Sequence, residues 1–179
     1  MKIVVLLKQV PAISEIKLDP ETHNLVRTGA PTMMNPVDKH AVEAALTLKE
    51  AAGDGTVTIV TMGSESAADI MREAIALGAN DGFLVSDPGV RGSDTLATGR
   101  VLAKAIAKVG QVDLVLTGKQ SADGDTGQIP PAIAQRLDMN LLSYVQDISL
   151  AGNTLKAIRK NLGGVETVEA PLPCVVSVT

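Results

Sequence analysis

Three almost uninterrupted apolar stretches constrain the fold of this chain more than any other feature. They cover residues 3–7, 112–116 and 174–178. A strand with one face in water alternates apolar and polar residues, whereas a strand covered on both faces carries a continuous apolar run. We therefore expect central strands of a mainly parallel sheet, with helices packed on both sides.

The composition indicates a core built from aliphatic side chains. Of the 179 residues, 45% are hydrophobic but only 1% are aromatic, namely Phe83 and Tyr144. A chain of this length suits one domain with a substantial core. We predict a single domain over residues 1–179, with a three-layer, doubly wound α/β fold.

Charge and residue counts exclude several classes of protein. The net charge of −4 and the shortage of aromatic residues disfavour nucleic acid as a partner. A single cysteine, Cys174, excludes an internal disulfide, and two histidines disfavour a histidine metal cluster. Because the sequence shows no signal peptide and no apolar run of membrane-spanning length, we expect a cytoplasmic protein without an integral membrane segment.

Turn residues and apolar spacing divide the chain into further elements. We predict a small hairpin over residues 16–27 with His23 in its turn, and a C-terminal hairpin turning at residues 152–153. The remaining predicted elements are helices at 37–52, 64–77, 92–109 and 129–137, and strands at 55–63, 82–86, 141–145, 163–170 and 174–179.

A glycine-rich loop at residues 118–128 lies between the apolar run 112–116 and a helix with prolines in its first turn. Glycines let the backbone approach an anion, and the N–H groups and dipole of a helix start favour negative charge. Thr126 is a candidate helix N-cap or phosphate donor. Asp123 and Asp125 would repel a phosphate, so we expect them to accept hydrogen bonds from backbone N–H groups or from a sugar hydroxyl. The loop contains neither a Walker motif nor a dinucleotide fingerprint, so a plain surface turn is an equal alternative.

Other candidates follow the predicted strands, because ligands of open α/β sheets lie beyond the carboxyl ends of the strands. Leu6 and Lys8 end the first strand, and Met62 and Gly63 end the second. Leu6 and Met62 are equally explained as core residues. Asn35 precedes Pro36 and is explained either as a helix cap or as an amide that faces a ligand.

The loop sequence Gly-Lys-Gln-x-x-Asp-Gly-Asp-Thr-Gly-Gln resembles the adenine-nucleotide loop of the β subunit of electron transfer flavoproteins. Met-Asn-Pro at 34–36, Ser-Asp-Thr-x-Ala-Thr at 93–98 and Pro-x-Val-Val-Ser at 173–177 match the same family, whereas Leu162 occupies a usually acidic position. The family continues beyond residue 179, so we expect this chain to be part of a longer protein.

The resemblance implies an adenine nucleotide α-hydrolase-like, Rossmann-like fold that binds FAD or, alternatively, AMP. The 93–98 segment of this chain is similar to the same segment in family members that hold FAD in this subunit. Capping of the following helix by Ser93 or Asp94 explains the segment equally. Neither aromatic residue lies near these segments in the sequence, so none is available to stack on a flavin ring. The cofactor-binding residues implied are Leu6, Lys8, Asn35, Met62, Gly63, Asp94, Thr95, Thr98, Gly118, Gln120, Ser121, Asp123, Gly124, Asp125, Thr126, Gly127 and Gln128.

As a function, the resemblance implies an electron carrier rather than an enzyme with catalytic side chains. It implies a heterodimer with an α subunit that shuttles electrons between flavin dehydrogenases and an acceptor. The FAD-holding branch adds NADH and ferredoxin or flavodoxin as reaction partners. The alternative is an α-hydrolase-like enzyme or a universal stress protein. The sequence disfavours that alternative because Lys8-Gln9-Val10-Pro11 stands where a pyrophosphate loop would follow the first strand.

Overall fold

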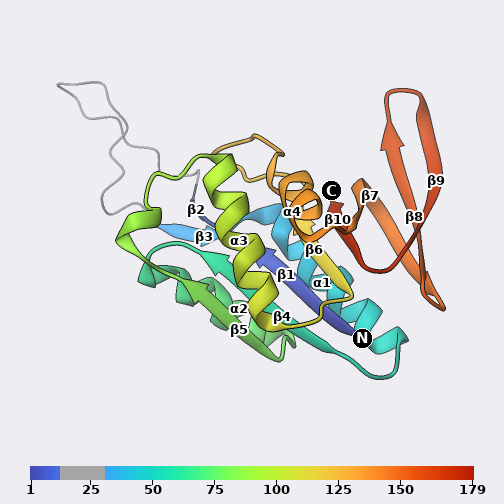
Figure 1. The fold of residues 1–179 in the computed structure, drawn as a ribbon, viewed down its shortest axis with the longest axis horizontal. Helices are drawn as coiled ribbons and strands as arrows, with labels where there is room; N and C mark the ends of the chain where they lie inside the picture. Colours follow the sequence, from blue (N-terminus) through green and yellow to red (C-terminus); the bar gives the residue numbers. More distant parts are fainter. Residues whose placement is uncertain (13–30) are drawn as a thin grey trace.

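The computed structural model describes residues 1–12 and 31–179. The predicted hairpin at 16–27, with His23 in its turn, lies outside the described residues. Within them, Figure 1 shows a twisted central sheet with helices on both faces.

The described residues form an eight-stranded sheet with the order β5-β4-β1-β6-β10-β7-β8-β9. The strands from β5 to β7 in this order pair in parallel, and only the pairs β7–β8 and β8–β9 are antiparallel. A separate antiparallel pair joins β2 to β3. The bounds are β1 (Lys2–Leu7), β2 (Gln9–Pro11), β3 (Thr32–Met34), β4 (Thr56–Met62), β5 (Asp81–Val85), β6 (Leu114–Gly118), β7 (Asn140–Ala151), β8 (Thr154–Asn161), β9 (Gly164–Pro171) and β10 (Cys174–Val178).

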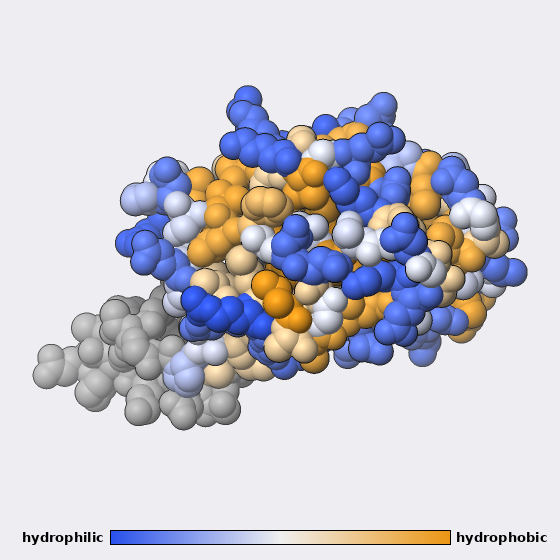
Figure 2. Space-filling view, turned by 90° about the horizontal axis from the view of Figure 1, so that it is seen from below, coloured by the Kyte–Doolittle hydropathy of each residue, from blue (hydrophilic) through white to orange (hydrophobic). Residues whose placement is uncertain are grey.

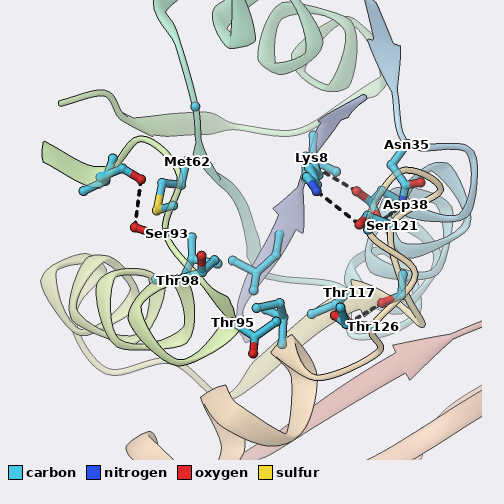
Figure 3. Close-up of a pocket in the computed structure, with 18 of the residues that line it drawn as sticks. Lys8, Asn35, Asp38, Met62, Ser93, Thr95, Thr98, Thr117, Ser121 and Thr126 are labelled. Atoms are coloured by element: carbon cyan, nitrogen blue, oxygen red, sulfur yellow. Dashed lines mark hydrogen bonds between the residues drawn. The ribbon is translucent and has the colours of Figure 1, made fainter. Parts of the chain in front are cut away.

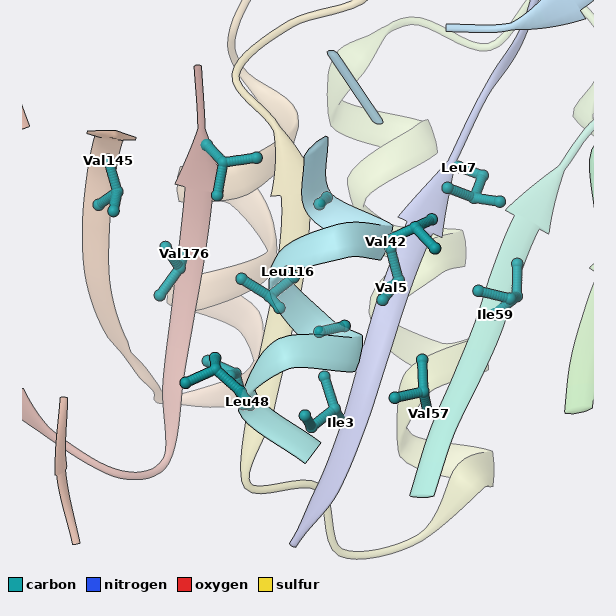
Figure 4. Packing of buried hydrophobic residues seen from close by; sticks show 14 of the residues in the cluster. Ile3, Val5, Leu7, Val42, Leu48, Val57, Ile59, Leu116, Val145 and Val176 are labelled. Carbon is teal, nitrogen blue, oxygen red and sulfur yellow. The ribbon is translucent and has the colours of Figure 1, made fainter. Parts of the chain in front are cut away.

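Two hydrophobic layers enclose the sheet and confirm the predicted three-layer architecture. Ile3 and Val5 of β1 face α1 (Pro36–Ala51) and α2 (Ala68–Leu77) in one layer, as Figure 4 shows for α1. Val4 and Leu6 of the same strand belong to the other layer, with α3 (Thr95–Val109) and α4 (Ile129–Leu137). Successive residues of a strand point to opposite faces, so the continuous apolar run fills both layers.

The C-terminal part adds antiparallel strands to the parallel sheet. Strand β7 turns at Gly152 into β8, and β9 forms the edge of an extension that projects from the body of the molecule in Figure 1. The chain then returns as β10, which lies between β6 and β7 and is fully buried. The predicted C-terminal hairpin is therefore confirmed, and the last apolar strand is internal to the sheet.

The surface at the opposite edge mixes polar and apolar residues. Ile75 and Leu77 of α2 and Phe83 of β5 are about half exposed. Figure 2, seen from below the view of Figure 1, shows apolar patches between polar side chains on that face. In the part of the chain that the structure describes, no helix is long and apolar enough to cross a membrane.

Two residues that the sequence offered as possible helix caps, Asn35 and Thr126, do not cap a helix with their side chains. Asn35 occupies the N-cap position of α1, but its side chain makes no capping hydrogen bond. The N-cap position of α4 is Gln128, not Thr126, because Ile129 and two prolines form the first turn. Asp94 is confirmed as the cap of α3, where its side chain accepts from the backbone N–H of Ala97. The segment 64–77 is not one α-helix, since a short 3₁₀ turn, η2 (Glu65–Ala67), precedes α2.

Candidate functional site

A cleft of about 1170 Å³ opens at the carboxyl edge of the parallel strands β1, β4 and β6. The first turns of α3 and α4 lie on it, so two helix N-termini face the same space. Figure 3 shows Lys8, Asn35, Asp38 and Ser121 on one side, and Met62 and Ser93 on the other. This is the position in which open α/β sheets bind ligands.

Most of the residues predicted from the sequence line this cleft, although they come from five separate segments. Only Asp123, Asp125 and Gln128 of the predicted set do not. The predicted residues that line it are Leu6, Lys8, Asn35, Met62, Gly63, Asp94, Thr95, Thr98, Gly118, Gln120, Ser121, Gly124, Thr126 and Gly127.

Asn35 holds the 118–128 loop from the start of α1. Its Nδ2 donates to the backbone oxygen of Gln120 at 2.9 Å, and its Oδ1 accepts from the backbone N–H of Ala122 at 3.0 Å. The same Nδ2 also donates to Asp38 Oδ1 at 2.8 Å. The side chain is 1% exposed. Both amide protons and the amide oxygen are therefore engaged with protein groups.

Asp38, which the sequence analysis missed, is a buried carboxylate below the loop. It is 5% exposed, and its Oδ2 accepts from the backbone N–H of Lys8 at 2.8 Å. Burial raises the pKa of Asp38 to about 7, although hydrogen bonds from Asn35, Lys8 and Gly118 oppose the rise. The Asn35-Pro-Val-Asp38 spacing, a cap position followed three residues later by an acid, is the sequence signal that could have identified it.

Lys8 ties the end of β1 to the same loop. Its Nζ donates to Ser121 Oγ at 3.2 Å and pairs with Asp123 Oδ1 at 2.7 Å. Partial burial alone would raise the pKa of Asp123, but hydrogen bonds from Lys8 and Ser121 and the charge of Lys8 outweigh it and lower the pKa. Asp125 accepts from the side chain of Gln120. In the structure the donors to these aspartates include the side chains of Lys8 and Gln120, which the sequence analysis did not identify.

Two glycines of the loop are required by its geometry. A Cβ on Gly118 would overlap the carboxylate of Asp38 and lie 2.7 Å from Val37 Cγ2. Gly127 has a φ of 62°, in the left-handed region that glycine adopts without strain. The loop therefore lies directly on the first turn of α1, and a larger residue at Gly118 cannot be accommodated without movement.

The opposite wall of the cleft is the 86–94 loop, which is held mainly by its own residues. Asp87 Oδ1 accepts from the N–H of Gly89 at 2.7 Å and caps the turn η3 (Pro88–Val90). Ser93 Oγ donates to the backbone oxygen of Val90 at 2.8 Å. Arg91 also lines the cleft and adds a positive charge that the sequence analysis did not identify.

Tyr144 lies near the loop despite its distance in the sequence. It sits at a bulge of β7 with a φ of 59°, and its backbone N–H donates to Ser177 Oγ at 3.1 Å. Its hydroxyl is 3.5 Å from the position of a Cβ on Gly127. No aromatic residue lies near the site in the sequence, but the fold brings Tyr144 close to the glycine-rich loop. Register shifts of this kind are not visible in a sequence pattern.

The chemistry of the cleft is that of a binding site. Loop glycines, hydroxyls and the N-terminus of α4 at one end are suited to an anion, and Leu6, Met62 and Leu102 give the middle an apolar lining. Within residues 1–12 and 31–179, no group of three or more histidine, cysteine or acidic side chains could hold a metal ion.

Comparison with known proteins identifies the same family over most of the chain. A family described as "Electron transfer flavoprotein domain" matches residues 22–179. The chain is 43% identical to an electron transfer flavoprotein subunit beta of Megasphaera elsdenii and 43% identical to the caffeyl-CoA reductase-Etf complex subunit CarD of Acetobacterium woodii. It is 45% identical to the protein FixA of Azorhizobium caulinodans. These alignments cover 99% of this chain but 68%, 68% and 65% of the three relatives, so the chain spans about two thirds of their length.

Proposed function

This chain belongs to the electron transfer flavoprotein family, in the group of β subunits and FixA proteins, and from that premise we propose that its cleft binds an adenine nucleotide, with FAD preferred over AMP. We further propose that it works as the β subunit of a heterodimer. Together with an α subunit it would carry electrons between a flavin dehydrogenase and an acceptor.

The single observation that carries the nucleotide proposal is the shape of the 118–128 loop at the mouth of the cleft. Gly118 lies so close to Asp38 and Val37 that the loop backbone reaches the first turn of α1. Glycines at 124 and 127 line the cleft without side chains that would keep a phosphate away. Residues Gly118, Gln120, Ser121, Thr126 and Gly127 would hold the phosphates, together with the N-terminus of α4.

The extent of the cleft favours FAD. From the 118–128 loop it continues past Thr95 and Thr98 to Ser86 and Arg91. A mononucleotide bound at the loop would leave the far end, with Arg91 and the α3 N-terminus, without a ligand. Ligand clefts of drug-sized molecules occupy about 300–1000 Å³, so about 1170 Å³ accommodates a dinucleotide.

The protein's part in the chemistry is to bind and orient. Leu6, Met62 and Leu102 would contact the adenine and ribose, and Asp94, Thr95 and Thr98 would face the ribityl or pyrophosphate region. Asn35 would act on the nucleotide through the loop, because its amide is already engaged with Gln120 and Ala122. When bound, the flavin would supply the electron-accepting and electron-donating chemistry.

The partners follow from the family. One relative is named as a subunit of a caffeyl-CoA reductase–Etf complex, which supports a flavin dehydrogenase as the electron partner of this chain as well. If the cleft holds FAD, NADH and a ferredoxin or flavodoxin are the further reaction partners that we propose.

The first test is the identity of the nucleotide that leaves the purified protein on denaturation, read by chromatography with absorbance detection. Release of FAD from this subunit supports the full proposal. Release of AMP retains the nucleotide site but contradicts the preference for FAD. Absence of any adenine nucleotide, together with failure of FAD, AMP and ADP to bind in titrations, contradicts the proposed function.

A matched pair of variants tests the FAD preference independently. Thr98→Val removes a hydroxyl from the cleft wall while keeping the shape of the side chain, and we expect it to weaken FAD about threefold to tenfold but to leave AMP unchanged. Arg100→Gln, an exposed position on the same helix, is the control. Equal affinity of the Thr98 variant and wild type for FAD would contradict the proposed pose.

A further inference from the structure

We propose that Asp38 is a positioning residue whose negative charge holds the 118–128 loop in its nucleotide-binding shape, so that protonation of this carboxyl weakens nucleotide binding. The inference rests on the proposed nucleotide site, but it concerns a residue that makes its contacts with protein groups.

Asp38 is the point at which three parts of the site meet. Its Oδ2 accepts from the backbone N–H of Lys8, at the end of β1, and its Oδ1 accepts from Asn35 Nδ2. The third part is Gly118, at the end of β6, whose backbone lies so close to Asp38 that an added Cβ would overlap the carboxylate. The two hydrogen-bond partners are N–H donors, one for each carboxylate oxygen.

Asn35 transmits the position of Asp38 to the loop. The amide group of an asparagine can rotate about its last bond, which exchanges the positions of Oδ1 and Nδ2. Hydrogen-bond partners on both sides of the amide fix the two positions. Asp38 accepts one Nδ2 proton, which leaves the other for the backbone oxygen of Gln120 and the Oδ1 for the N–H of Ala122. The carboxylate thus orients the amide, and the amide orients two backbone groups of the loop.

Protonation removes this arrangement because a carboxylic acid needs an acceptor for its own proton. The hydrogen-bond partners of Asp38 are the N–H groups of Lys8 and Asn35, and neither group can accept a proton from the carboxyl. Protonation also makes the oxygen that carries the proton a weaker acceptor, and at 5% exposure the carboxyl cannot turn into water. We therefore expect the protonated form to weaken its bond to Asn35 or Lys8 and, through Asn35, to loosen the loop.

Few other charges act on Asp38 within the described residues. On β1, the ammonium of Lys8 favours the charged form, and this ammonium is itself paired with Asp123 of the loop at 2.7 Å. On α1, His40 has another partner, since its Nδ1 lies 3.0 Å from the backbone oxygen of Thr179. Burial outweighs the favourable contacts and raises the pKa of Asp38 to about 7, so the two forms exchange within a usable pH range.

The expected size of the effect follows from the fraction of the charged form. If only that form binds, its fraction falls about tenfold between pH 8 and pH 6 for a group with a pKa of about 7, and affinity falls by the same factor. FAD is the appropriate probe, because the second ionisation of a phosphate monoester such as AMP lies near pH 6 and would itself change in this range.

The experiment compares FAD affinity at pH 6, 7 and 8 for the wild type and Asp38→Asn. We expect wild-type affinity to fall about tenfold on acidification. The Asp38→Asn protein should bind at least tenfold more weakly than wild type at pH 8 and show no pH dependence. Glu43→Gln, an exposed position on the same helix, and a double replacement of His23 and His40 by Gln should follow the wild type, because histidines titrate in the same range.

Hydrogen exchange of the ligand-free protein tests the positioning role without reference to nucleotide binding. At pH 8, the amide of Ala122 should lose protection in both Asp38→Asn and Asn35→Ala, whereas the amide of Lys8 should lose it only in Asp38→Asn. The Asn35 variant keeps the assay informative if the Asp38 variant fails to fold. This assay stays valid even if no nucleotide binds and the proposed function fails.

Three outcomes would overturn the inference. One is Ala122 protection in Asp38→Asn equal to that of wild type. Another is a wild-type FAD affinity that is unchanged or stronger at pH 6, which would mean that repulsion between the carboxylate and the bound anion dominates. The third is a wild-type pH dependence that persists in Asp38→Asn.

Discussion

The two loops that face each other across the cleft are held in different ways. The 118–128 loop is bound by side chains that lie far away in the sequence: Asn35 reaches Gln120 and Ala122, and Lys8 reaches Ser121 and Asp123. The 86–94 loop is bound by neighbours, with Asp87 reaching Gly89 and Ser93 reaching Val90. One loop depends on the fold of β1 and α1, and the other mainly on its own few residues.

Because of this difference, different substitutions should change the conformation of each loop. A substitution in β1 or α1 should disturb the 118–128 loop although the loop sequence is unchanged, whereas the 86–94 loop should respond to substitutions within the loop itself. We call the 118–128 loop the platform, because side chains from β1 and α1 hold it, whereas the 86–94 loop forms a wall whose conformation is determined locally. The following predictions test this contrast, from the largest expected effect to the smallest.

The largest expected effect is the change of the free energy of unfolding with pH that results from the buried carboxylate of Asp38. An unfolded aspartate loses its proton near 3.8, whereas folded Asp38 loses it near 7. Between these values the folded protein binds the proton more strongly, so this group's contribution to the free energy of unfolding falls as the pH rises from about 4 to about 7. The total fall is on the order of 4 kcal/mol.

Urea denaturation across this pH range would measure the effect as the difference between wild type and Asp38→Asn. We expect this difference to shift against the wild type as the pH rises, and to become constant above about pH 8. Acidification from pH 8 to pH 6 should then stabilise the fold while it weakens FAD binding. A difference in stability that does not change with pH would show that Asp38 ionises at its ordinary value.

Gly118→Ala should give the next largest effect, because the added methyl group meets the buried carboxylate of Asp38 and lies 2.7 Å from Val37 Cγ2. Overpacking of this kind costs about 1–3 kcal/mol, and here it also displaces the loop. We expect a lower melting temperature and loss of FAD binding. Gly92→Ala, in the opposite wall, is the informative counterpart: no atom lies within 4 Å of its added methyl group, so only its φ of 74° opposes the change. Equal loss of binding in both variants would remove the contrast between the loops.

Asp94→Ala should produce a smaller and local effect. The side chain caps α3 by accepting from the N–H of Ala97 at 2.8 Å, and loss of such a cap costs about 1 kcal/mol. Hydrogen exchange should show fraying of the first turn of α3, with the amide of Ala122 in the other wall unchanged. Loss of protection at Ala122 would indicate that the two walls are coupled.

The smallest effect is expected for Asp123→Asn. The pair with Lys8 joins side chains that are 45% and 37% exposed, and such pairs contribute about 0–1 kcal/mol. We expect a stability change below about 1 kcal/mol at pH 7, measured by urea denaturation, because Ser121 still accepts from Lys8. A loss of several kcal/mol would show that Lys8, and not Asp38 with Asn35, is the main anchor of the platform.

The same contrast between local and distant contacts distinguishes the features that could be predicted from the sequence from those that could not. The elements of the parallel sheet and the cap at Asp94 depend on local patterns, and they were predicted with bounds close to those observed. The start of α4 at Gln128, in place of a cap at Thr126, depends on the exact helix start, and the pair of Asp123 with Lys8 joins residues far apart in the sequence, so local patterns did not predict either. The Asn35-Pro-Val-Asp38 spacing marks Asp38 as an acid in the first turn of a helix, but this pattern does not show that a glycine loop will cover the carboxylate.

The sequence by itself determined that this chain forms a parallel, helix-covered sheet, because continuous apolar runs are stable only when both faces of a strand are buried. It also determined the family, through its loop and strand-end motifs. Only the tertiary structure decided that Asp38 is a buried acceptor, that Asn35 serves the loop and that Tyr144 lies beside Gly127. The physical reason is that burial and hydrogen-bond partners depend on which distant segments meet, and a linear pattern does not contain that information.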